Sequence, residues 1–177
     1  MDLREVNEFI KDSIGIIITF VAVILFFTLV LSVQSITGNS MHPNYKSGDF
    51  VLVSKSLYKM GKIKRFDVVN VLDDEGKFYI KRVIGLPGDN IYYLNNMLFI
   101  NGEPYQEPFL DNILTNNFML EDVCKDTCID DKIPEGMYLV LGDNRSDSLD
   151  SRVETFGLRP KSSIKGKVLL KIWSTKS

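Results

Sequence analysis

The chain contains a single histidine, His42, among its 177 residues. A serine hydroxyl is a weak nucleophile until a neighbouring base takes its proton, and histidine is a common base for that task. His42 lies two residues after Ser40, in the stretch GNSMHP, and a side chain so close in sequence is badly placed to turn back onto that hydroxyl. The sequence therefore argues against a Ser-His-Asp triad. The remaining option is a lysine kept neutral by burial, as in Ser-Lys hydrolases. Lys81, in the strand-like stretch FYIKRVIGLPGD, is the base that fits.

The chain also has a small net charge and only two cysteines. The 21 basic residues nearly balance 23 acidic ones, so no basic excess indicates a nucleic-acid partner. Cys124 and Cys128 lack a histidine pair, so a zinc site would lack ligands, and Asp143 and Asp150 lack the spacing of a calcium loop. No metal or cofactor is implied. The two cysteines form either a small loop disulfide, which an oxidising compartment favours, or two free thiols.

One long apolar run interrupts the ordinary composition. Residues 14–33 read IGIIITFVAVILFFTLVLSV without a charge, and 20 helical residues reach about 30 Å, the thickness of the hydrocarbon core. A cleaved signal peptide is the alternative, but its apolar core has roughly 7–15 residues and its leader is basic. The leader here carries Asp2, Glu5 and Glu8. We therefore expect an uncleaved transmembrane anchor over 14–33.

The positive charges on either side of this run indicate its orientation. Arg4 and Lys11 precede it, and only Lys46 follows soon after. The positive-inside rule then favours a cytoplasmic leader at 1–13 and an extracytoplasmic domain at 35–177. This places the chain in the cytoplasmic (inner) membrane as a single-pass protein.

The part after the anchor consists of short β-like runs separated by turn signals, which predicts a mostly β domain. Asn95-Asn96 and Asn101-Gly102 mark tight turns, the first of them in a hairpin. Residues 103–135 hold three prolines and both cysteines, and we interpret them as an irregular insertion. The expected strands lie within 48–55, 66–72, 77–84, 91–94, 97–100, 137–143 and 165–173.

Three motifs carry a resemblance to a known family. SMHP (40–43), YIKRVIGLPGD (79–89) and GDNRSDSLDSR (142–152) resemble, in order, three sequence boxes of the bacterial type I signal peptidases, which are Ser-Lys dyad serine peptidases. GDFVLVSK (48–55) is a weaker match, and the resemblance covers about residues 14–172. It implies coiled antiparallel sheets behind one transmembrane helix, with a variable second subdomain at the insertion. It also implies a membrane-anchored endopeptidase that cuts signal peptides from exported preproteins through an acyl-enzyme.

The resemblance assigns roles to individual residues. Ser40 would be the nucleophile and Lys81 its base, because burial of a lysine disfavours the ammonium and lowers its pKa. Ser148 would hydrogen-bond the lysine amine and orient it. Asp150 and Arg152 would form a pair that holds their loop against the lysine strand.

Substrate pockets and the oxyanion site follow from the same resemblance. Shallow pockets for small side chains would be lined by Ile36, Met41, Tyr79 and Ile80. The Ser40 N–H is one oxyanion donor. Some family members add a hydroxyl two residues before the nucleophile, where this chain has Gly38, so the second donor stays open. We expect this position to accept a side chain.

The partners expected are preprotein signal peptides and the lipid bilayer, and the oligomeric state is not indicated. Two other functions remain to be weighed. One is a self-cleaving LexA-like Ser-Lys peptidase, which would lack the anchor and carry a DNA-binding helical module. The other is a non-catalytic, membrane-tethered β module that binds exported chains.

Overall fold

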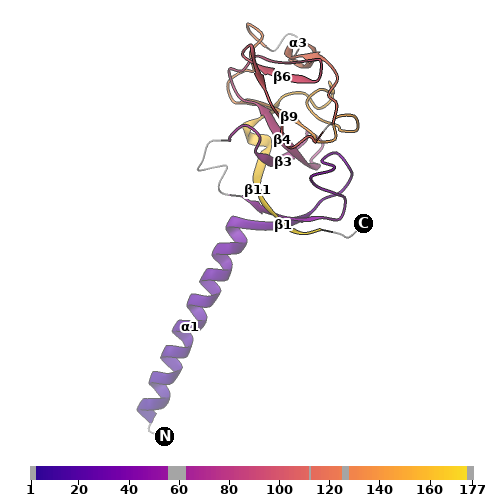
Figure 1. Cartoon of the computed structure of the whole chain (residues 1–177). Coiled ribbons are helices and arrows are strands. Elements are labelled where there is room, and N and C mark those ends of the chain that lie inside the picture. The colour runs from indigo at the N-terminus through magenta and orange to yellow at the C-terminus, as the bar shows by residue number, and fades with distance from the viewer. Residues whose placement is uncertain (1–2, 56–62, 112, 125–127, 175–177) are drawn as a thin grey trace.

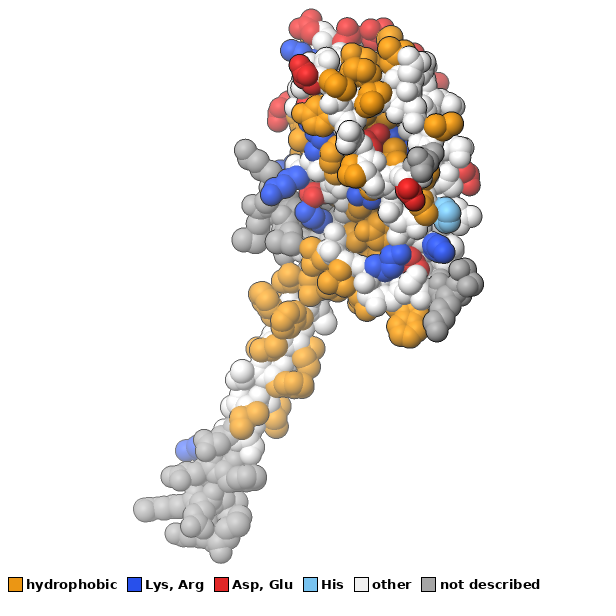
Figure 2. All heavy atoms as spheres, in the orientation of Figure 1, with side chains coloured by type: hydrophobic (Ala, Val, Ile, Leu, Met, Phe, Trp, Pro, Cys, Tyr) orange, Lys and Arg blue, Asp and Glu red, His pale blue; other side chains and the backbone are white. Residues whose placement is uncertain are grey.

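A single long helix projects from a β domain (Figure 1). The structure, a computed structural model, describes residues 3–55, 63–111, 113–124 and 128–174. Helix α1 spans Leu3–Val30, so the predicted leader and the apolar run form one continuous helix. Apolar side chains cover its described part (Figure 2). Its segment Ser13–Val30 has a mean hydropathy of 2.8 and is not buried by the rest of the chain. A helix that is apolar on all faces, and that the rest of the chain does not cover, is expected in a non-aqueous environment.

The helix ends earlier than the apolar run predicts. Leu31–Ser35 form strand β1, which pairs antiparallel with β2 (Phe50–Ser54). The Lys55 N–H also donates to the Val30 carbonyl oxygen at 2.8 Å, so β2 caps the end of the helix. Because these backbone groups find partners in the sheet, the last three residues of the predicted 14–33 span belong to the β domain. That domain starts at residue 31 and not at 35.

The main sheet has seven strands in the order β1-β2-β11-β3-β4-β9-β10. Each pair in it is antiparallel, as predicted for a mostly β fold. The sheet curls strongly: Asn70 of β3 donates to Gln34 of β1 at 2.6 Å, although β2 and β11 lie between those strands. The remaining bounds are β3 Val68–Leu72, β4 Phe78–Gly85, β9 Met137–Leu141, β10 Arg159–Pro160, η2 Lys161–Ser163 and β11 Ile164–Trp173.

A second, four-stranded sheet has the order β7-β6-β5-β8. The predicted hairpin is confirmed, with Asn95 and Asn96 at φ values of 50° and 65° in its turn. The predicted insertion at 103–135 is not irregular throughout, because it supplies β7, β8 and α3, and its two strands share one sheet with β5 and β6. Cys124 and Cys128 are joined by a disulfide. The elements are β5 Ile91–Leu94, β6 Met97–Ile100, β7 Glu103–Tyr105, β8 Phe118–Met119 and α3 Leu120–Cys124.

The two sheets share one hydrophobic cluster. Ile84 and Leu139 of the main sheet pack with Ile91, Tyr93 and Leu98 of the small sheet, and all five side chains are buried. Burying side chains of this size stabilises the fold by roughly 1.5–3 kcal/mol each. The small sheet is therefore an integral part of the core and not a loose appendage.

A buried cation joins the small sheet to the loop after β9. Arg145 is 4% exposed. It donates to Glu107 Oε1 at 2.5 Å, to the Tyr93 hydroxyl at 2.9 Å and to Thr115 Oγ1 at 2.8 Å. Its backbone oxygen accepts from Arg152 at 2.8 Å. The loop that carries the third sequence motif is therefore anchored on the small sheet.

We predict that Glu107→Ala lowers the free energy of unfolding by about 3 to 5 kcal/mol, since it leaves a buried guanidinium without its counter-ion. The exposed pair Lys77–Glu75, with its N–O distance of 2.9 Å, supplies the matched control. Glu75→Ala should not change stability measurably, because solvent screens an exposed pair. Chemical unfolding of the detergent-solubilised chain measures both variants. Equal effects of the two substitutions would contradict a stabilising role of the buried pair.

Candidate active site

Ser40 lies in the loop between β1 and β2. This loop is closed by two backbone hydrogen bonds, from Ile36 N to Asp49 O and from Gly48 N to Ile36 O, both 2.8 Å long. The Ser40 carbonyl oxygen accepts from the Asn144 N–H at 3.0 Å, which joins the nucleophile loop to the third motif. His42 is exposed. Its place on the surface agrees with the expectation that it is no base for Ser40.

Lys81 is buried in β4 and is 1% exposed. Its Nζ donates to Ser148 Oγ at 3.1 Å, as the resemblance implied. Burial lowers the pKa of Lys81 to about 8; the Asp150 carboxylate opposes this shift and the Arg152 guanidinium adds to it. With this pKa roughly one amine in ten is neutral at pH 7, and this neutral form is the one that can act as a general base.

The lack of a side chain at Gly142 allows Ser40 and Ser148 to lie close together. A Cβ added at Gly142 would collide with the Ser148 side chain and with the Ser40 backbone oxygen. Ser40 and Ser148 therefore approach each other over this glycine, and Lys81 bonds to Ser148. Among the described residues, Ser148 is the hydrogen-bond partner of the lysine amine, and the Ser40 hydroxyl has none. Catalytic hydrogen bonds in unliganded enzymes often tighten only when substrate binds.

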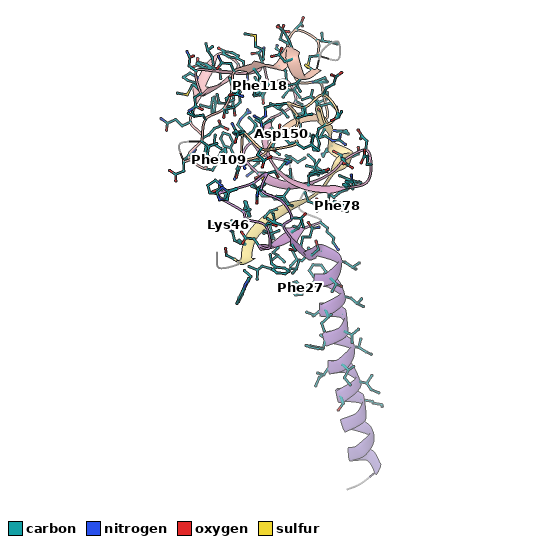
Figure 3. The ribbon with its side chains drawn as sticks, turned by 90° about the vertical axis from the view of Figure 1, so that its right-hand side faces the viewer. Phe27, Lys46, Phe78, Phe109, Phe118 and Asp150 are labelled. Atoms are coloured by element: carbon teal, nitrogen blue, oxygen red, sulfur yellow. A yellow bond between two sulfur atoms is a disulfide. The ribbon has the colours of Figure 1, made fainter. Side chains whose placement is uncertain are left out.

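Asp150 and Arg152 form the expected pair. The two residues pair with each other, with an N–O distance of 2.8 Å, inside their own loop. Asp150 also accepts from the Gly142 N–H at 2.9 Å. Burial raises the pKa of Asp150, but Arg152 and the hydrogen bonds from Gly142 and Ser148 outweigh burial and hold the pKa below its usual range. This pair shapes the loop around Ser148, and in the part of the chain that the structure describes its hydrogen bonds stay within the third motif. Figure 3 shows Asp150 in the interior of the β domain.

The tie to the lysine strand is a pair that the sequence did not reveal. Arg82 donates to both carboxylate oxygens of Asp143, at 2.8 Å and 2.6 Å. Asn44 Nδ2 donates to the same carboxylate at 2.9 Å. The pair thus joins β4, the third motif and the nucleophile loop.

The backbone at Gly38 argues against the expectation that this position accepts a side chain. An added Cβ would find open space, but the residue has a φ of 82°, which L residues rarely adopt. The backbone, and not crowding, therefore favours glycine here. The Ser40 N–H has no acceptor in the part of the chain that the structure describes, so it is available to an oxyanion.

A cavity of about 110 Å³ opens beside Ser40. Along β4, pairing with β9 begins only at Arg82, so residues 78–81 lie beyond the end of that neighbour. Phe78 lies on the side of the domain nearer the helix (Figure 3). The cavity is lined by all four residues expected to form substrate pockets, Ile36, Met41, Tyr79 and Ile80, and by Gln34, Ser35, Thr37, Ser40, Asn70 and Phe78.

Comparison with known proteins matches the fold and the motifs to one family. The family model "Signal peptidase, peptidase S26" matches residues 7–173. Signal peptidase I of Bacillus caldolyticus is 42% identical over 168 residues, covering 89% of each chain. Signal peptidase IB of Staphylococcus aureus is 36% identical over 175 residues, covering 94% of this chain and 91% of the relative.

A solved structure agrees with these sequence matches. The crystal structure of a signal peptidase I from Enterococcus faecalis V583 is 37% identical, with a TM-score of 0.53, and covers 62% of this chain and 97% of that one. The family match spans most of the helix, the nucleophile loop, the Lys81 motif and the Ser148 motif together, and it favours this assignment over a LexA-like repressor. The chain belongs to the signal peptidase family, peptidase S26.

Proposed function

We propose that this chain is a membrane-anchored serine endopeptidase that removes signal peptides from exported preproteins, with Ser40 and Lys81 as its catalytic dyad. The observation that carries the proposal is the burial of Lys81 beside Ser148, where the Ser40 backbone also passes. Its named relatives are signal peptidases I and IB, which supports the same reaction.

The geometry supports a two-step acyl transfer. Neutral Lys81 takes the proton of the Ser40 hydroxyl as Oγ bonds to the scissile carbonyl carbon. The Ser40 N–H donates to the oxyanion. The C–N bond then breaks, Lys81 returns its proton to the leaving amine, and an acyl-enzyme remains. Water, deprotonated by Lys81, attacks the ester and releases the signal peptide and Ser40.

The edge of β4 supports binding of the substrate as an extended strand. Residues 78–81 continue past the end of β9, so an extended peptide can pair with their free backbone groups. Alternate side chains of the peptide would then enter the cavity lined by Ile36, Met41, Tyr79 and Ile80. A volume of about 110 Å³ admits small side chains only.

A binding module without catalysis is less consistent with these residues. A buried lysine is costly because its charge loses hydration. A module that only binds exported chains gives no reason to bury Lys81 to 1% exposure with a lowered pKa. A general base requires both features.

The membrane arrangement forms part of the proposal. We infer one crossing of the cytoplasmic membrane by α1, with the leader in the cytoplasm and the β domain on the outer face. The uncovered apolar segment Ser13–Val30 and the position of Lys11 support this. β1 follows the helix directly (Figure 1). Gln34 and Ser35 at its far end line the cavity, so in this arrangement the cavity lies close to the bilayer surface. A signal peptide would emerge there from the membrane.

Ser40→Ala should abolish cleavage, because the variant lacks the attacking oxygen, while thermal unfolding stays near that of the wild type. The test incubates a preprotein with the detergent-solubilised full chain and follows release of the mature protein. A variant that cleaves at the rate of the wild type would refute the nucleophile assignment.

Lys81→Arg should be inactive, because a guanidinium keeps its proton at any pH a protein tolerates. In the wild type the rate should rise with pH, with a midpoint near the Lys81 pKa of about 8, since the ammonium below that value cannot accept a proton. Single-turnover cleavage across the pH range measures this limb. Retained activity in the arginine variant would show that Lys81 supplies only charge.

Ser148→Ala should lower kcat about fivefold with little change in KM, because it removes one hydrogen bond that positions the base but no group that lines the cavity. Ser146→Ala is the matched control, since that exposed serine of the same loop bonds Asn144 at 3.1 Å and not the lysine. The two variants should differ in kcat. Equal losses would assign the effect to the loop in general and not to the bond with Lys81.

A further inference from the structure

Two amide side chains line the cavity beside Ser40. Asn70 comes from β3, where it interrupts an otherwise apolar VVNVL strand, and Gln34 comes from β1. Asn70 is 1% exposed, so almost none of its surface is open to solvent.

This pair leaves hydrogen-bonding capacity unused. Asn70 Nδ2 donates to Gln34 Oε1 at 2.6 Å, while Asn70 Oδ1 is buried without a partner. Gln34 Nε2 likewise has no acceptor among the described residues. A buried unpaired carbonyl costs about 1–3 kcal/mol, so it is a place where a ligand group that supplies the bond gains affinity.

The position of the pair indicates which substrate residue reaches it. Asn70 lies directly opposite Ile80 in the β3–β4 register, on the cavity side of β4. An extended peptide presents every second side chain to the same face, roughly 6.6 Å apart. The residue before the cut lies next to Ser40 and Met41. The next side chain on that face belongs to the third residue before the cut, and it points towards the Asn70–Gln34 pair.

We propose that Asn70 and Gln34 form a polar subsite that selects a hydroxyl side chain, serine or threonine, at the third residue before the cleavage site. A hydroxyl donates to the Asn70 carbonyl and accepts from the Gln34 amide. It also satisfies the pair if both amides are turned round, because it is donor and acceptor at once. This inference rests on the proposed function.

The test compares two peptide substrates that differ only in serine or alanine at the third residue before the cut. With the wild-type full chain in detergent, kcat/KM should be about three- to tenfold higher for the serine peptide, the effect of one added hydrogen bond. The same exchange at the fourth residue, whose side chain faces away, is the substrate control and should have no effect.

Asn70→Val should abolish the preference, so that kcat/KM becomes the same for the serine and the alanine peptide. Valine suits this strand position, which is flanked by Val69 and Val71. Asn117→Val is the matched control and should keep the preference, because this exposed asparagine lies just before β8, where it accepts from the Asn95 N–H and does not line the cavity. If the single variant does not fold, Gln34→Leu combined with Asn70→Val replaces both amides by apolar side chains.

The outcomes separate this inference from the function on which it rests. Equal cleavage of the two peptides by the wild type, or a serine preference that survives Asn70→Val, would overturn the subsite alone. Absence of any cleavage at the predicted bond would overturn the peptidase function and the subsite with it.

Discussion

The bidentate contact between Arg82 and Asp143 is the constraint on which the site depends. Arg82 is next to the lysine on β4, and Asp143 is next to the glycine over which Ser40 and Ser148 meet. Asp143 is 0% exposed and also accepts from Asn44 of the nucleophile loop. A buried ion pair adds little net stability, but its fork geometry fixes direction and distance. Three segments distant in sequence are thereby held in one arrangement.

The charges around Lys81 are arranged so that burial decides its protonation. Asp143 is paired with Arg82, and Asp150 with Arg152, so each carboxylate that could stabilise the ammonium already faces a guanidinium. The opposing effects of Asp150 and Arg152 on the Lys81 pKa leave desolvation as the largest cause of its shift. Removing one arginine would free a carboxylate to hold the proton on Lys81. These structural pairs are therefore also part of the chemistry.

The sequence predicted the strands, the Asn95-Asn96 hairpin and the dyad because each has a local signal: alternation, turn residues or a motif. It did not predict where the helix ends, since Leu31 and Val33 are apolar in a membrane span and in a strand alike. It missed Arg82–Asp143, Arg145–Glu107 and Asn70–Gln34, because contacts between distant segments leave no local pattern. The sequence likewise did not reveal the positive φ of Gly38, because glycine in a GNS turn is compatible with several backbone conformations.

The curl of the main sheet brings Gln34 and Asn70 together in the cavity. In a flat sheet β1 and β3 would be separated by β2 and β11, and Gln34 could not reach Asn70. Because the sheet closes on itself, the strand that leaves the membrane helix and the strand next to Lys81 form opposite walls of one cavity. β1 connects the end of α1 directly to the nucleophile loop, and its residues Gln34 and Ser35 line the cavity. A substrate whose apolar segment stays in the bilayer can thus present its cleavage site to Ser40 only in a narrow range of registers.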